Sequence, residues 1–438
     1  MPLTRDEILA LDRAHVWHPY TSVDDAETLD PIVVARAEGP WLVDVDGRRY
    51  LDGNASWWVA TLGHGHPRVL RALEEQARTL AHVAFAGTAH EPASALAREL
   101  VAVAPPGLTR AFFTDDGSTS IEVAIKIAIQ LFVNEGRPGK KRFLALDGAF
   151  HGETIGATAL GGVDVFKKPF SGVLFECVHA PFPAEGAYAA AFEAMAELVR
   201  REHETIAAVF VEPLVQGASG MRTYPPSFLR ALREVTREHD VLLVLDEVFT
   251  GYGRTGCMWA AEHAGITPDM LCTGKAFAAI LPMAATLVTE RVHGAFRGGK
   301  DKTLWYGHTF CGNPLGAAVA REVLAIYRDE DVVGQARRKA PRIAAAFEAL
   351  RDLPGVARVR HLGMMGALDL EGGVHMDTGY LGDLGWKVFA EAKARGAYLR
   401  PLGDTVYVCP PLTIAEGDLE ALLGIVDASV RAALLSSR

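Results

Sequence analysis

Cysteine is scarce in this chain, with five residues among 438, and none of the five lies close to another in the sequence. A disulfide framework uses an even set of cysteines, and a structural zinc site uses closely spaced pairs of ligands. The pattern fits neither, so we expect reduced thiols, no bound metal and a cytoplasmic protein. The cysteines are Cys177, Cys257, Cys272, Cys311 and Cys409.

Positive charge is also in short supply. The chain holds 44 Lys and Arg residues against 54 Asp and Glu residues, a formal net charge of −10, and no basic cluster stands out in the sequence. An acidic surface repels the phosphates of nucleic acids, so we expect no nucleic-acid partner and look for small-molecule substrates instead.

Long apolar runs are missing as well. A membrane-spanning helix needs about 18 or more apolar residues in succession, whereas the longest runs here, such as VLLVL at 241–245, have the length of a strand. Acidic residues such as Asp6 and Asp12 interrupt the N-terminal stretch. This stretch has neither the apolar centre of a secretory signal nor the acid-free face of a transit peptide. We therefore expect no membrane contact.

What is present is the composition of a globular protein, with 49% hydrophobic and 22% charged residues, which excludes a disordered chain. Between about residues 65 and 330, helical stretches alternate with short apolar runs. Parallel strands need helical crossovers, so this alternation predicts an α/β fold on a mostly parallel sheet. The runs lie at 111–114, 142–146, 206–213, 241–247, 269–274 and 283–289.

The two ends of the chain have a different pattern. The segment PWLVDVDGRRYLDG predicts a hairpin that turns at Asp46 and Gly47, and another α/β stretch follows residue 330. We expect a large central domain at 61–330. The simplest arrangement combines 1–60 and 331–438 into one smaller domain.

A turn before a helix offers a candidate anion site. In DDGSTSIEVAIKIAIQLF, Gly117 allows a tight turn, Ser118 can cap the helix, and the apolar residues that follow have helical spacing. Backbone N–H groups and the positive end of the helix dipole suit a phosphate there. The alternative is an ordinary capped and buried helix, which needs the same residues.

Asp246 and Lys275 are the most informative pair of residues. Each follows a short apolar strand, and the carboxyl ends of parallel strands lie at one edge of a sheet, where α/β sites form. A structural ion pair is one interpretation. The other is a lysine that forms an imine, with a carboxylate that binds a cationic ring nitrogen. Together with the phosphate site at Gly117 and Ser118, these residues match what pyridoxal 5′-phosphate requires.

Three other motifs are weak. GYGRTG at 251–256 matches a dinucleotide fingerprint, but residues intervene between the strand and the glycines. Gly274 and Lys275 are not part of a phosphate-binding P-loop, because the glycine required five residues earlier is Asp269. His64 and His66 could form a metal pair, but with no third ligand nearby we expect ordinary loop histidines.

Longer segments resemble the class III pyridoxal-phosphate aminotransferases, and the resemblance covers nearly the whole chain. It is carried by EPLVQGASGMRTYPP, by LVLDEVFTGYGRTGCMWAAEHAGITPDMLCTGKAF and by YGHTFCGNPLGAA. It implies the type I fold of pyridoxal-phosphate enzymes. Three further pieces resemble the branch of this family that makes 7,8-diaminononanoate for biotin: HVWHPYTS, DGNASWWVATLGHGHP and LRPLGDTVYVCPP.

The resemblance assigns roles to individual residues. Lys275 would bind the cofactor covalently and move protons, and Asp246 would bond to the pyridine nitrogen. The further cofactor-binding residues would be Gly117, Ser118, Phe150, Glu212, His308 and Thr309, with Thr309 reaching across the interface of a homodimer. The substrate-binding residues would be Tyr20, Trp57, Trp58, Phe150, Gly307, Arg400 and Tyr407, with Arg400 on the remote carboxylate of 8-amino-7-oxononanoate.

Three positions depart from the usual family pattern. Phe150 stands where Tyr is usual, His308 where Pro is frequent, and Glu153 where Asp is commoner. All three lie near the side of the amino donor, which is S-adenosyl-L-methionine in most of this branch and lysine in some relatives.

Alternatives stay open at this point. The nearest is another class III ω-aminotransferase that acts on ornithine-like or ω-amino acids. A pyridoxal-phosphate mutase or decarboxylase would use the same fold, and a binding protein without activity would make the placement of Lys275 and Asp246 accidental.

Overall fold

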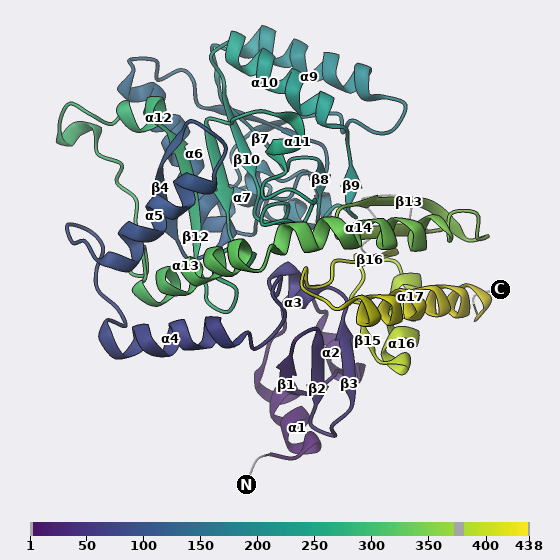
Figure 1. The fold of residues 1–438 in the computed structure, drawn as a ribbon. Coiled ribbons are helices and arrows are strands. Elements are labelled where there is room, and N and C mark those ends of the chain that lie inside the picture. Colours follow the sequence, from purple (N-terminus) through teal and green to yellow (C-terminus); the bar gives the residue numbers. More distant parts are fainter. Residues whose placement is uncertain (1–2, 372–380, 437–438) are drawn as a thin grey trace.

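A seven-stranded sheet forms the centre of the large part of the molecule, in the order β4-β12-β11-β10-β7-β5-β6 (Figure 1). The computed structural model describes residues 3–371 and 381–436. The pairings from β11 to β6 are parallel, whereas β12 is antiparallel to β11 and to β4. The strands are β4 (Leu108–Thr114), β5 (Arg142–Leu146), β6 (Cys177–Ala180), β7 (Ile206–Val211), β10 (Leu242–Asp246), β11 (Met270–Thr273) and β12 (Ala284–Thr289).

The predicted α/β fold with a mostly parallel sheet is therefore confirmed. Every residue of β7 and of β10 is buried, as expected for strands covered by helices on both faces. The sequence pattern missed β6, a short strand at the sheet edge. The helices of this part of the chain are α4 (Pro67–Thr79), α5 (Glu91–Val103), α6 (Gly117–Asn134), α7 (Ile155–Leu160), α8 (Asp164–Lys167), α9 (Tyr188–Glu202), α10 (Pro226–Glu238), α11 (Ala261–Ala264), α12 (Glu290–Gly294) and α13 (Pro314–Asp329).

Helix α6 begins differently from the prediction. Its N-cap is Asp116, not Ser118: the Asp116 carboxylate accepts a hydrogen bond from the N–H of Thr119 at 2.8 Å, and the Thr119 hydroxyl accepts from the N–H of Asp116 at 3.2 Å. This reciprocal capping box satisfies the helix end. Ser118 therefore lies inside the first turn, and its hydroxyl is not used to cap the helix.

A second sheet joins the two ends of the chain. Its order is β1-β2-β3-β15, with β1 (Val34–Glu38), β2 (Trp41–Asp44), β3 (Arg49–Asp52) and β15 (Ala397–Tyr398). The predicted hairpin of β2 and β3 is present, and Gly47 in its turn has a φ of +83°. Strand β15 pairs in parallel with β3. The domain boundaries at 60/61 and 330/331 stay a prediction.

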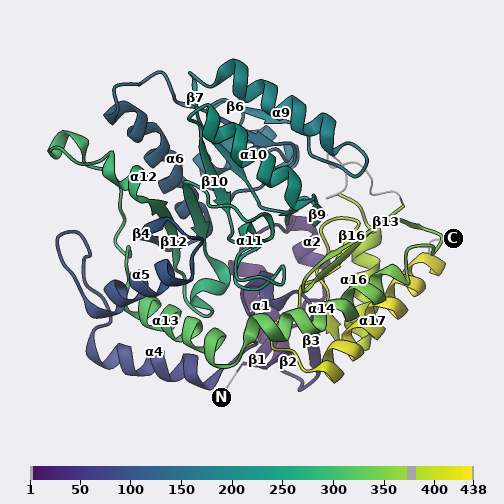
Figure 2. The same ribbon diagram turned by 45° about the horizontal axis from the view of Figure 1, so that its top comes forward.

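The remaining elements lie around these sheets (Figures 1 and 2). Strands β13 (Val356–Leu362), β14 (Met365–Leu370) and β16 (Thr405–Val408) form an antiparallel sheet, and β8 (Val215–Gln216) pairs with β9 (Arg222–Thr223). The other helices are α1 (Arg5–His15), α2 (Val23–Thr28), α3 (Ala55–Trp58), α14 (Val332–Glu348), α16 (Leu384–Arg395) and α17 (Glu416–Ser436). Within the described ranges, every helix is too short or too polar to cross a membrane.

Candidate active site

A cavity of about 470 Å³ lies at the carboxyl ends of β10 and β11. Residues that are far apart in the sequence line it together, as expected for a site at this edge of an α/β sheet. The lining includes most of the residues predicted to bind the cofactor: Gly117, Ser118, Phe150, Glu212, Asp246 and Lys275, together with Trp58.

Lys275 projects into this cavity immediately after β11. Its backbone is left-handed, with a φ of +48°, a conformation that is strained for a residue with a side chain and is frequent at functional sites. Its Nζ lies 4.9 Å from the centre of the Trp58 ring. Burial lowers the pKa of the amine, while the negative charges of Asp246 and Glu212 partly oppose this shift. More of the amine is therefore neutral and able to act as a nucleophile.

Asp246 is held in place by two donors. Its Oδ2 lies 2.8 Å from Nδ1 of His151, and its Oδ1 accepts a hydrogen bond from the N–H of Val248 at 3.1 Å. Both side chains are almost fully buried. The Nε2 atom of His151 is buried without a hydrogen-bond partner among the described residues. The sequence analysis missed His151, although it directly follows Phe150, which the resemblance assigned to the cofactor.

Glu212 lines the same cavity and binds two backbone N–H groups. Its carboxyl group accepts hydrogen bonds from the N–H of Phe150 at 3.1 Å and from the N–H of Gly217 at 2.8 Å. Burial raises the pKa of Glu212 to about 7, with the charge of His151 acting against it. Glu212 thus positions the loop that carries Phe150, whose ring packs edge-on against Phe166.

Two glycines keep space open around Ser118. A Cβ on Gly117 would lie 2.8 Å from Cγ1 of Val248, and a Cβ on Gly152 would lie 2.1 Å from Oγ of Ser118. The Ser118 hydroxyl also accepts a hydrogen bond from the N–H of Glu153 at 3.2 Å. A serine hydroxyl and the first turn of an 18-residue helix therefore face the cavity. This is the arrangement that binds a phosphate group.

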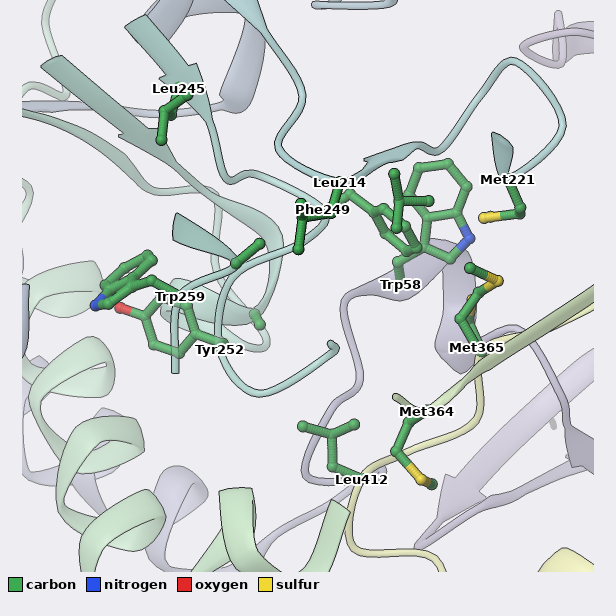
Figure 3. Packing of buried hydrophobic residues seen from close by; sticks show 14 of the residues in the cluster. Trp58, Leu214, Met221, Leu245, Phe249, Tyr252, Trp259, Met364, Met365 and Leu412 are labelled. Atoms are coloured by element: carbon green, nitrogen blue, oxygen red, sulfur yellow. The ribbon is translucent and has the colours of Figure 1, made fainter. Parts of the chain in front are cut away.

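Aromatic side chains form the wall opposite the sheet. The indole N–H of Trp58 donates a hydrogen bond to the Tyr407 hydroxyl at 3.1 Å, and the Trp58 ring centre lies 4.5 Å from that of Phe249. Figure 3 shows these two rings against each other, near Leu214 and Met221. A wall of this kind suits an aliphatic substrate chain.

A second cavity, of about 620 Å³, shares no lining residue with the first, and its lining includes Trp57, Tyr407 and Arg400. The Arg400 guanidinium lies 5.2 Å from the Trp57 ring centre and 5.6 Å from that of Trp386. Among the described residues, no carboxylate lies within 4 Å of it. The nearby Asp404 accepts hydrogen bonds from the backbone of Leu384 and Gly385 instead. Arg400 and Asp404 therefore form no ion pair with each other.

Tyr20 connects the N-terminal segment with both regions. Its hydroxyl donates a hydrogen bond to the Glu153 carboxylate, and its carbonyl accepts one from Arg400 at 3.3 Å. Its ring packs edge-on against Trp57. Burial raises the pKa of Glu153, and the bond from Tyr20 lowers it.

Gly307, His308 and Thr309 are not brought into the cavity of their own chain. Thr309 is exposed, and His308 lies 3.4 Å from Asp115, which lines the cavity. The loop that carries them also exposes two large aromatic side chains, Trp305 and Phe310.

No cluster of metal-binding side chains is found within residues 3–371 and 381–436. His64 and His66 have separate partners: Nε2 of His64 lies 2.8 Å from Asp52, and that of His66 lies 3.4 Å from Glu330.

Comparisons with known proteins agree with this geometry. The profile of the class-III aminotransferases matches residues 21–430. An adenosylmethionine-8-amino-7-oxononanoate aminotransferase from Nitratidesulfovibrio vulgaris is 40% identical, over 96% of this chain and 81% of its own length. The crystal structure of the protein of that name from Methanocaldococcus jannaschii has a TM-score of 0.94 and 31% identity, covering 98% of this chain and 99% of its own.

A pyridoxal-phosphate-bound amine transaminase from an uncultivated Pseudomonas species is also similar. Its TM-score is 0.90 and its identity 31%, covering 96% of this chain and 99% of its own. The family profile, the relative and the solved structures each match nearly the whole chain, and they agree with the type I fold and with the cavity around Lys275. This chain therefore belongs to the class III aminotransferases.

Proposed function

We propose that this protein transfers an amino group to the ketone of 8-amino-7-oxononanoate and so forms 7,8-diaminononanoate for biotin synthesis. The observation that carries the proposal is the set of features on the two sides of one turn: Trp58 lies against the Lys275 amine, and Trp57 lies against Arg400, which has no carboxylate partner in the described chain. The 40% identity to a relative of that name supports it.

Pyridoxal 5′-phosphate fits the residues of the first cavity. Ser118 and the N-terminus of α6 would hold its phosphate, Phe150 would pack on its ring, and Asp246 would bond to the ring nitrogen. When bound, the cofactor supplies an aldehyde that exchanges with amines and a ring that accepts electrons. The charge of Asp246 favours the protonated ring, and His151 keeps that carboxylate in place.

Lys275 would act as the base and then the acid of the reaction. Its neutral amine, favoured by burial, takes a proton from the carbon next to the donor nitrogen and delivers it to the cofactor side. The Trp58 wall keeps water away from this transfer, because its ring lies directly over the lysine.

The ketone substrate has a long aliphatic chain that ends in a carboxylate. Trp57, Trp58 and Tyr407 would line the chain, and the fork of Arg400 would bind the carboxylate. The donor is S-adenosyl-L-methionine or lysine in this proposal. Its binding region would include Phe150 and Glu153, which line the cavity, and Tyr20, whose hydroxyl donates to Glu153.

The proposal includes a homodimer in which Gly307, His308 and Thr309 of one subunit complete the site of the other. It is supported by the exposure of Thr309 and by its exposed aromatic neighbours Trp305 and Phe310. A phosphate dianion needs more donors than one helix turn supplies. All five cysteines are free, which supports the proposed cytoplasmic location.

The test is an amino-transfer assay on the purified protein with exchange of substrates. We expect 8-amino-7-oxononanoate to be converted faster than the keto forms of ornithine-like or ω-amino acids, and either S-adenosyl-L-methionine or lysine to bleach the cofactor absorbance. A preference for an ω-amino acid would favour the broader ω-aminotransferases. Absence of transfer to every ketone would favour a mutase or decarboxylase, and a protein that binds no cofactor would contradict an enzymatic role.

A further inference from the structure

A third cavity, of about 500 Å³, lies where β9 meets β13 and shares no residue with the lining of the cofactor cavity. Strands β9 and β13 lie in contact with each other (Figure 1). Basic side chains dominate its lining: Arg222, Arg351, Arg358, Arg360 and His361 face only two acids, Glu185 and Glu348.

Two of the arginines are neutralised within the structure. Arg351 forms two hydrogen bonds with the Glu348 carboxylate, at 2.6 and 2.7 Å, and Arg360 forms two with Asp369, at 2.8 and 2.6 Å. These are bidentate pairs, which balance the charge of each guanidinium.

The other two guanidinium groups, those of Arg222 and Arg358, have no carboxylate within 4 Å among the described residues. Arg222 packs on the face of Phe182, 3.9 Å from the ring centre, and donates to the carbonyl of Asp147 at 2.5 Å. Its Nε is buried without a hydrogen-bond acceptor in the described part of the chain. Burial lowers the pKa of Arg222 to about 10. The negative charges of Glu212 and Asp147 oppose this shift, and the smaller effects of the positive charges of Arg358 and Arg360 add to it.

The charge of Arg222, whose Nε is buried without an acceptor in the described part of the chain, is costly unless an anion balances it. We propose that this cavity is a binding site for a small phosphate-bearing anion, held by Arg222 and Arg358. Guanidinium forks match the oxygens of a phosphate, and the charge of about −2 on a phosphate monoester matches the two unpaired arginines.

The site is linked to the cofactor cavity by one loop. Arg222 lies in β9, whose partner strand β8 leads into Gly217, and the N–H of Gly217 donates to Glu212. Arg360 donates from Nε to the carbonyls of Gly220 and Met221, at 2.7 and 3.0 Å. An anion bound here would therefore fix the loop whose Gly217 N–H donates to Glu212, the residue that also accepts from the N–H of Phe150. Because it binds the folded state, it would also stabilise the holoenzyme against unfolding.

The experiment is calorimetric titration of the cofactor-loaded protein, whose catalytic phosphate site is already filled. The probes are inorganic phosphate and glycerol 3-phosphate, at low and at high salt. We expect one additional site per chain, with binding weaker at high salt because the contacts are ionic. Glycerol 3-phosphate binding more tightly than phosphate would identify a phosphate ester as the ligand, and equal binding would identify free phosphate.

Arg358→Gln is the main variant, because Arg358 is exposed and forms no ion pair with any other described residue. The loss of this guanidinium should raise the dissociation constant of the phosphate probes about tenfold. Arg98→Gln, at a side chain that is 79% exposed and far along the sequence from the cavity, is the matched control and should leave binding unchanged. No heat at millimolar concentrations of either probe, or equal weakening by Arg98→Gln, would overturn the proposal.

Discussion

The Ser56 hydroxyl donates a hydrogen bond of 2.7 Å to the buried carboxylate of Asp52. Ser56 lies within four consecutive left-handed residues, Ala55 to Trp58, whose φ angles are 46°, 45°, 62° and 75°. Left-handed backbone costs roughly 1–2 kcal/mol for each residue with a side chain. The Asp52 carboxylate also lies 2.8 Å from Nε2 of His64. The carboxylate of Asp52 therefore helps to hold a strained turn that directs Trp57 and Trp58 into two separate cavities.

Two substitutions of Ser56 separate the effect of its hydrogen bond to Asp52 from the cost of its left-handed backbone. Ser56→Ala and Ser56→Gly both remove the hydrogen bond to Asp52, but only alanine keeps the cost of the left-handed backbone. We expect Ser56→Gly to be more stable than Ser56→Ala by about 1 kcal/mol, measured by urea denaturation. A Ser56→Ala variant at least as stable as Ser56→Gly would show that the turn is not strained.

Lys275 should be the residue that borohydride links permanently to the cofactor. Reduction followed by peptide mapping should find the label there, and Lys275→Ala should lose the label and reduce turnover by several orders of magnitude. Lys140 is the matched control, because burial lowers its pKa to about 8, although it lies outside the cavity and donates to the carbonyls of His203 and Asp240. Label on Lys140 would contradict the assignment.

Arg400 should serve the ketone half of the reaction more than the donor half. Arg400→Ala should weaken ketone binding by roughly one to two powers of ten, and Arg400→Lys should already weaken it because the planar fork is lost. Single-turnover kinetics of each half-reaction measure the two effects separately. Equal losses in both halves would mean that Arg400 binds both substrates or supports the fold.

Glu212 should make the stability of the cofactor-free protein depend on pH. Its pKa is about 7 in the folded chain, against an ordinary value of 4.5, so the folded state binds more protons between these two values. The contribution is fully present below about pH 4.5 and is lost as the pH rises through about 7, at a slope of up to roughly 1.4 kcal/mol per pH unit. Urea unfolding between pH 5 and 8 measures this slope.

Glu212→Gln should flatten that slope. Glu247, whose pKa burial also raises to about 7, contributes a similar slope and remains in the variant as an internal reference. An unchanged slope in Glu212→Gln would show that Glu212 is ionised in the folded protein at acidic pH.

Gly152→Ala should reduce cofactor affinity. The new Cβ would lie 2.1 Å from Oγ of Ser118, so the hydroxyl must leave its position in the proposed phosphate site. Gly47→Ala is the control for the cost of a positive φ alone, because nothing lies within 4 Å of its Cβ position. Both variants should lose stability, but only Gly152→Ala should release pyridoxal phosphate, measured by equilibrium dialysis. Equal affinity in both would contradict the role of Ser118.

The sequence predicted the parts of this molecule that depend on local pattern. Fully apolar runs marked β7 and β10, and the positions of Asp246 and Lys275 after their strands placed both side chains in one cavity. The predicted N-cap of α6 was wrong by two residues. Aspartate and serine both cap helices, and only the reciprocal hydrogen bonds between Asp116 and Thr119 distinguish the two candidates.

Other features depend on contacts between distant residues. The pair of His151 and Asp246 joins positions 95 residues apart, and nothing in the spacing of the sequence indicates it. The left-handed turn at Ala55–Trp58 contains no glycine, so the usual signal of a positive φ is absent. Thr309 was assigned from family resemblance, and its role in a partner subunit stays a prediction.

The two ends of the chain meet beside the paired tryptophans. The N–H of Gly53 donates to the carbonyl of Tyr398, the N–H of Cys409 to that of Gly53, and the N–H of Leu412 to that of Thr61. The ribosome synthesises Leu412 about 10 seconds after β12, the last strand of the large sheet, at the usual rate of synthesis. During that interval the growing chain already contains Trp58 and Phe249 but lacks Tyr407, the acceptor of the Trp58 indole N–H. The substrate site is thus among the last parts of the protein to be assembled.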